Sequence, residues 1–176
     1  MDTIPEDNLY EFVTNHESSF TFLSPTFTLE RKQAFVHSLV ELIENPDTDH
    51  ERLNLALNAL QLLARELLGS EEIFARSTFE SLIRHAGFDA CSSPAEVSAL
   101  KCLSNVLYQS EDLRSIFLSS QKMQVLLEMI RDHAQSRELM TSRVQIAFVL
   151  SANSPEAASM ITQAGLLNVL ADVRFF

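Results

Sequence analysis

Three stretches of the chain superimpose on one another when the sequence is shifted by about 43 residues. Apolar residues then coincide at four sets of positions. The sets are Leu60 with Leu103 and Ile146, Leu63 with Val106 and Val149, Phe74 with Phe117 and Met160, and Ile83 with Leu126 and Val169. A unit of this length cannot bury its apolar face alone, so successive units stack and share one continuous core. The repeat therefore predicts a solenoid.

Composition indicates that the repeated units are helical. The chain has 176 residues, of which 46% are hydrophobic, with only 3 Gly and 5 Pro, a balance that favours helices over sheets or disorder. The formal net charge is −11, which repels nucleic-acid phosphates and anionic lipid. We therefore expect an all-α domain that does not bind nucleic acid.

The cysteines and the termini bear on the compartment. Cys91 and Cys102 are eleven positions apart, and Cys102 lies within an apolar helical pattern, which favours a reduced, buried thiol over a disulfide or a redox role. No stretch approaches the roughly 18 apolar residues of a membrane span. The acidic start, residues 1–7, differs from the basic start of a signal peptide. These features predict a cytoplasmic protein without a transmembrane segment.

Apolar periodicity and helix-capping residues divide the chain into helices. The sequence Ser93-Pro94-Ala95-Glu96 is typical of a helix start, because the serine can cap, the proline fits the first turn and the glutamate completes a capping box. Ser154-Pro155 repeats this signal. The predicted helical ranges are 6–16, 28–45, 53–69, 70–87 with a bend at 77–78, 93–109, 110–119, 121–133, 137–152, 154–164 and 166–176.

The order of helix lengths indicates the type of repeat. Each unit reads as a long, a short and a medium helix, which favours three-helix armadillo repeats over two-helix HEAT repeats. We predict an all-α, right-handed α-solenoid of the armadillo/HEAT type. Residues 1–27 form an N-terminal helix and entry arm, and residues 28–176 form about three and a half armadillo-like units. The last helix ends on Phe175-Phe176 without a polar cap, so we expect a cut end or an end that a partner covers.

Polar residues recur at helical spacing on one face of two successive long helices. They are Asn58, Gln61 and Arg65 in the first and Lys101, Asn105 and Tyr108 in the second. Stacking aligns the two rows, and amide, guanidinium and phenol groups suit a partner helix with exposed carbonyls and a terminal carboxylate. The alternative is a solvated helix face. Tyr108 and Phe148 continue the row, although aromatic residues at this spacing are more often core.

Patterns for catalysis are missing from the sequence. The five histidines have no metal-ligand spacing, and three scattered glycines build neither a phosphate loop nor a nucleophile elbow. The acidic pairs Glu71-Glu72 and Glu111-Asp112 stand at helix starts, where they complement the helix dipole. We expect no catalytic residues, no cofactor and no metal.

Two longer stretches carry a resemblance to known families. Residues 99–107 read Ala-Leu-Lys-Cys-Leu-Ser-Asn-Val-Leu, which looks like the third helix of an armadillo repeat, and residues 164–170 are similar to the opening of its second helix. Residues 15–22, Asn-His-Glu-Ser-Ser-Phe-Thr-Phe, precede a charged helix and, together with 99–105, resemble the synembryn family, cytosolic armadillo proteins that act on heterotrimeric G-protein α subunits. The likeness covers most of this chain and about the first third of a family member.

The resemblance implies a guanine nucleotide exchange factor and folding chaperone for Gα, which grips the nucleotide-free subunit by its C-terminal helix. In that family an arginine and an asparagine of the concave groove correspond to Arg65 and Asn105, and a second arginine is replaced by Gln61. It implies a cytoplasmic protein that its partner can bring to the plasma membrane. A generic armadillo scaffold for another peptide or protein is the alternative. A helical enzyme is a third hypothesis, which the aligned polar rows disfavour.

Overall fold

The computed structural model describes residues 6–17, 22–24, 27–89, 95–131 and 136–166, and every regular element in these ranges is helical. The all-helical prediction is thus confirmed for this part of the chain. The elements are α1 (Glu6–His16), α2 (Leu29–Glu44), α3 (His50–Leu63), the 3-10 helix η1 (Glu71–Phe74), α4 (Arg76–His85), α5 (Glu96–Gln109), α6 (Glu111–Ser119), α7 (Lys122–Arg131), α8 (Arg137–Asn153) and α9 (Pro155–Gln163).

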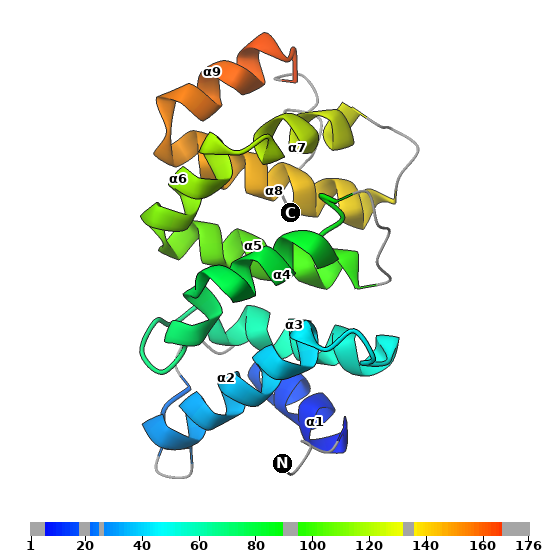
Figure 1. Ribbon diagram of the computed structural model, residues 1–176, viewed down its shortest axis with the longest axis vertical. Coiled ribbons are helices and arrows are strands. Elements are labelled where there is room, and N and C mark those ends of the chain that lie inside the picture. Colours follow the sequence, from blue (N-terminus) through cyan, green and yellow to red (C-terminus); the bar gives the residue numbers. More distant parts are fainter. Residues whose placement is uncertain (1–5, 18–21, 25–26, 90–94, 132–135, 167–176) are drawn as a thin grey trace.

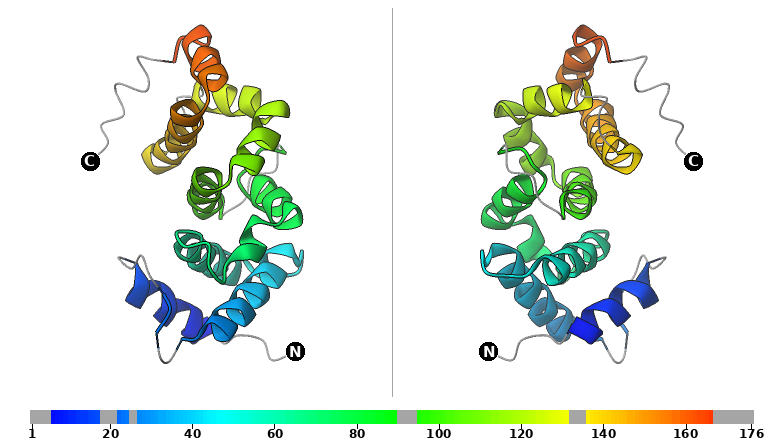
Figure 2. Two further views of the ribbon diagram at one scale, coloured as in Figure 1. Left: turned by 90° about the vertical axis from the view of Figure 1, so that its left-hand side faces the viewer. Right: turned by 90° about the vertical axis from the view of Figure 1, so that its right-hand side faces the viewer.

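The helices stack along the long axis of the molecule, with α1 and α2 at one end and α9 at the other (Figure 1). The long helices α3, α5 and α8 contact one another in turn and form one column, which α1 extends by packing on α3. Helices α2, α4, α6, α7 and α9 form a second column beside it (Figure 2). The stack is bowed, and the column of long helices lies on its inner side (Figure 2).

The predicted order of long, short and medium helices is confirmed in two units. The first contains α3, η1 and α4, and the second contains α5, α6 and α7. A third unit follows the same order with α8 and α9. Its last helix, predicted at 166–176, lies outside the described residues except for Leu166, as do Phe175 and Phe176.

Repeat-equivalent residues occupy equivalent places in the core. Leu60 of α3, Leu103 of α5 and Ile146 of α8 are all fully buried. The predicted burial of these three repeat positions is therefore confirmed, and their register in the stack stays a prediction. Cys102, next to Leu103, is a free and fully buried thiol, and burial raises the pKa of this thiol far above its ordinary value. It belongs to the core rather than to a reactive site.

Hydroxyl caps confirm two of the predicted helix starts. The hydroxyls of Ser110 and Ser154 accept from the backbone N–H groups three residues on, and Pro155 occupies the first turn of α9 as expected. Ser93 and Pro94 lie outside the described residues. Ser70, which directly precedes η1, does not cap it, because its buried hydroxyl donates to the carbonyl of Leu63 at 3.0 Å.

The end of α3 differs from the prediction. The helix stops at Leu63 rather than near Gly69, and Leu67, which lies within the predicted helical range 53–69, is 50% exposed. The cause is Lys32, a fully buried lysine of α2 whose ammonium donates to the carbonyl of Leu68 at 2.5 Å and pairs with Glu66 at 2.7 Å. A buried lysine requires such partners, so the chain leaves the helix to supply them.

Gly69 allows the chain to close over Lys32. Its φ of +77° lies in the left-handed region, and a Cβ there would sit 2.8 Å from Leu29 Cδ1 and 3.1 Å from Lys32 Cδ. Only glycine combines this backbone conformation with so close an approach. The turn between α3 and η1 is therefore set by the lysine it covers.

The first prediction concerns the register of the stack. Leu103→Ala should lower the free energy of unfolding by roughly 2–5 kcal/mol, because it removes fully buried methyl groups from the middle of the column. Leu67→Ala, at a half-exposed site, serves as the matched control and should cost much less. Urea unfolding followed by circular dichroism measures both. A loss at Leu103 below about 0.5 kcal/mol, the range of ordinary surface changes, would show that the register is wrong.

Candidate functional site

Helix α5 is joined to α3 by polar side chains at a constant offset. Three side chains of α5 donate hydrogen bonds to α3 or to the turn that follows it, and each bond spans 44 residues of sequence. The bonds run from Ser98 Oγ to Asn54 Oδ1 at 2.6 Å, from Asn105 Nδ2 to the Gln61 carbonyl at 2.8 Å, and from Gln109 Nε2 to the Arg65 carbonyl at 3.1 Å. We call this set the α3–α5 ladder. It holds the two long helices in one register.

Asn105 and Gln109 act at the C-terminal end of α3, where helix carbonyls lack partners within the helix. The chain tightens there, so that the N–H of Arg65 donates to Leu62 and that of Glu66 donates to Leu63. The backbone N–H groups of Ala64 and Arg65 donate to Leu60 and Leu62 and not to the Gln61 carbonyl between them. Asn105 Nδ2 donates to this carbonyl instead. A mid-helix asparagine, unfavourable for its own helix, thus caps the neighbouring one.

A hollow of about 240 Å³ opens beside this part of the ladder. Its lining residues are Ala64, Arg65, Asn105, Tyr108 and Gln109. The Tyr108 ring is 65% exposed at its edge. The Arg65 guanidinium is held by the backbone after α1, because Nη1 donates to the Glu17 carbonyl at 2.8 Å. The hollow therefore combines a fixed cation, two amides and an accessible phenol.

The structure brings together part of the predicted site. Arg65, Asn105 and Tyr108 line the hollow, whereas Asn58 and Gln61 lie part-buried along α3 outside its lining. Lys101 faces the next seam of the column, where its ammonium pairs with Glu138 of α8 at 2.8 Å. The two rows are aligned, as stacking requires, but only their C-terminal ends share one cavity.

The structure differs from the sequence interpretation at two aromatic residues and one amide. The core interpretation of Tyr108 and Phe148 is wrong, since their side chains are 65% and 58% exposed. Gln109 was missed, although it lies four residues after Asn105 and so on the same helix face. Alignment at 44 rather than 43 residues would have placed it opposite Arg65.

The chemistry of the hollow is that of recognition. Amide and guanidinium groups offer donors to a carboxylate or to backbone carbonyls, and the tyrosine ring adds an apolar face with a polar tip. Lining groups of these types bind and orient a ligand. A partner that ends in acceptor groups fits them best.

Two absences hold for residues 6–17, 22–24, 27–89, 95–131 and 136–166. Nowhere in them do three or more His, Cys, Asp or Glu side chains gather in a way that could hold a metal ion. Within these ranges, none of the helices has the length and apolar character needed to cross a membrane.

The fold is a stack of helices, and a hollow with a polar lining opens on its inner column. A family model described as guanine nucleotide exchange factor synembryn matches residues 56–173, which include most of α3 and all of α5, α8 and α9. The chain belongs to this family of guanine nucleotide exchange factors, as the sequence resemblance predicted. A search of curated proteins found no match.

The second prediction tests the capping role of Asn105. Asn105→Ala should lower the free energy of unfolding by about 1–3 kcal/mol, because the carbonyl of Gln61 loses its donor. Asn58→Ala is the matched control, since it makes the same change within a helix and leaves the ladder intact. Thermal or urea unfolding of both variants gives the difference. Equal stability of the two variants would contradict the capping role.

Proposed function

We propose that the chain is a guanine nucleotide exchange factor and folding chaperone for heterotrimeric G-protein α subunits. It binds the C-terminal helix of Gα along the inner column of α3, α5 and α8. The observation that carries the proposal is the hollow at the α3–α5 seam, in which Arg65, Asn105 and Tyr108 meet within the region that matches the synembryn family model. The protein acts in the cytoplasm and reaches the plasma membrane through its partner.

The C-terminus of a helix is a ligand of suitable chemistry for this hollow. It presents the last backbone carbonyls, the negative end of the helix dipole and, at a chain terminus, a carboxylate. The Arg65 guanidinium supplies a charge-assisted donor, and the amides of Asn105 and Gln109 each carry a second N–H beside the one used in the ladder. Exposed Tyr108 adds contact area at the rim.

The architecture proposed with this function is a right-handed armadillo stack. Residues 1–27 form the entry arm, and residues 28–176 form the repeats. The order of long, short and medium helices supports this assignment, as does the position of the long helices on the inner side of the bow (Figure 2). In such stacks the inner surface is the usual binding surface.

A single preference of the chain for one state of Gα would account for both nucleotide exchange and chaperoning. If the chain binds Gα more tightly when the nucleotide site is empty, linkage requires that it lower the affinity of Gα for nucleotide by the same factor. A preference for the folded over the unfolded subunit likewise shifts Gα toward its folded state. Binding to the C-terminal helix of Gα would therefore support both activities, without any group that performs covalent chemistry.

A generic armadillo scaffold for a different peptide is the second candidate. The α3–α5 ladder favours this candidate, because the hydrogen bonds of Asn105 and Gln109 to the end of α3 account for these two residues without a Gα partner. Both candidates use the inner column. They differ in the partner, so the decisive experiment must use a Gα segment.

The third prediction is the binding of a peptide with the sequence of the Gα C-terminal helix. Replacing Arg65 and Asn105 together by Ala should weaken this binding at least about tenfold, since hydrogen bonds to charged groups contribute about 1.5–3 kcal/mol each. Tyr108→Ala should also weaken it. Tyr10→Ala, at an equally exposed tyrosine of α1 outside the hollow, is the matched control and should leave affinity unchanged. NMR titration up to high micromolar peptide measures the affinity of the unsubstituted chain and of the three variants.

Three results would count against the proposal. Absence of binding in this range would leave the generic scaffold as the better function. Binding that ignores the Arg65, Asn105 and Tyr108 changes would keep the partner and move the site to the outer column. A loss of affinity in Tyr10→Ala as large as in Tyr108→Ala would show that the hollow has no special part.

A further inference from the structure

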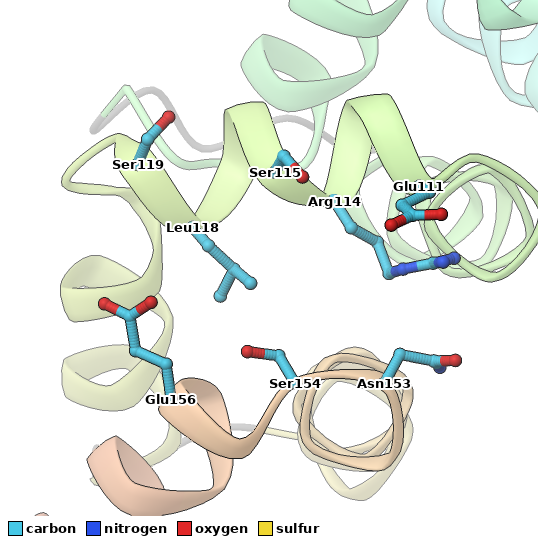
Figure 3. Close-up of a pocket in the computed structure, with 8 residues that line it drawn as sticks. All are labelled: Glu111, Arg114, Ser115, Leu118, Ser119, Asn153, Ser154 and Glu156. Atoms are coloured by element: carbon cyan, nitrogen blue, oxygen red, sulfur yellow. The ribbon is translucent and has the colours of Figure 1, made fainter.

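A second and larger hollow lies between α6 and the corner where α8 meets α9. Its volume is about 380 Å³, near the lower end of the ~300–1,000 Å³ range of ligand pockets, which suits a single side chain or a small group. Figure 3 shows side chains of α6 on one wall and those of Asn153, Ser154 and Glu156 on the other. The edge of the stack that carries it faces the viewer in the left panel of Figure 2.

Arg114 is a cation among the lining residues, and one of its nitrogens binds the end of α5. Arg114 Nη1 donates to the carbonyls of Leu107 at 2.7 Å and Tyr108 at 2.9 Å. These carbonyls belong to the last turn of α5, where a basic side chain caps the helix end. The guanidinium of Arg114 is thus directed to α5, and it ties one end of the hollow to the rim residue Tyr108.

The remaining polar groups of the hollow are mainly acceptors. Glu111 and Glu156 stand at its two ends, one on α6 and one on α9 (Figure 3). Asn153 uses its amide nitrogen on the Val149 carbonyl of its own helix at 2.8 Å, which leaves its amide oxygen as the accepting group. Both glutamates lie in first helical turns, where the dipole favours them. The helix dipole alone does not explain why both glutamates line the same hollow.

An apolar side chain lies between the two carboxylates. Leu118 of α6 points into the middle of the hollow, opposite Ser154 (Figure 3). An occupant therefore meets acceptors at the ends and a hydrocarbon surface in between. A long side chain with an aliphatic stem and a flat, multiply donating head has this pattern, because the stem packs on apolar surface while the head binds oxygen atoms.

We propose that this hollow is a docking site for an arginine side chain on a basic segment of a protein partner. The guanidinium carries five donors in a planar fork and can bind a carboxylate and an amide oxygen together, whereas a lysine ammonium is a compact charge. The net charge of −11 favours the approach of basic segments. The site lies on different helices from the α3–α5 hollow and requires no assumption about Gα.

The test is a titration of the whole chain with short capped peptides, followed by ¹⁵N NMR at low salt. The probe peptide carries one arginine among neutral residues. Matched peptides carry lysine or citrulline, the neutral analogue of arginine, at the same place. We expect the arginine peptide to shift backbone signals of α6 and of the α8–α9 corner, the lysine peptide to bind more weakly, and the citrulline peptide to leave these signals in place.

Variants assign the binding to the hollow. Glu156→Gln and Glu111→Gln should each lower the affinity for the arginine peptide by about threefold, as expected for exposed charge pairs. Glu51→Gln is the matched control, because Glu51 is also an exposed glutamate in a first helical turn, that of α3. It should leave the affinity unchanged.

The proposal is overturned by any of three results. These are the absence of shifts up to millimolar arginine peptide, equal binding of the lysine or citrulline peptide, and equal effects of Glu51→Gln and Glu156→Gln. Shifts confined to α3 and α5 would also overturn it, because they would place the arginine at the other hollow.

Discussion

The burial of α5 between α3 and α8 is the constraint on which the architecture rests. Buried residues occur on nearly every side of α5, including Leu100, Leu103 and Val106, so this helix cannot lie on a surface. It needs a long helix on each side and shorter helices behind it. Once α5 is placed in this way, the α3–α5 ladder fixes the register, and the ends of both helices form the hollow.

Two ion pairs, each with a buried cation, orient the elements around this column. Lys32 pairs with Glu66 under the turn after α3, and Arg143 of α8 pairs with Glu96 at the start of α5 at 2.5 Å. Loss of one partner in such a pair is costly, because it leaves a buried charge uncompensated. The pairs fasten α2 to the end of α3, and α8 to the beginning of α5.

The sequence could predict what depends on local pattern. Helix starts at Ser110 and Ser154 follow from capping chemistry, and the equivalence of Leu60, Leu103 and Ile146 follows from the repeat. The early end of α3 could not be read in this way, because it depends on Lys32, more than thirty residues earlier. A lysine on a charged helix looks solvated until its distant partners are known. The same holds for Asn105, whose partner lies 44 residues away.

The seam between α3 and α5 thus stabilises the stack and presents the groups proposed to hold a helix of Gα. Hydrogen–deuterium exchange of the chain, with and without nucleotide-free Gα, tests this double role without any substitution. If the seam is the binding surface, Gα should slow exchange most strongly in the last turns of α3 and α5, around residues 61–66 and 105–109. Protection confined to α2, α4 and α7, with the seam unchanged, would contradict it.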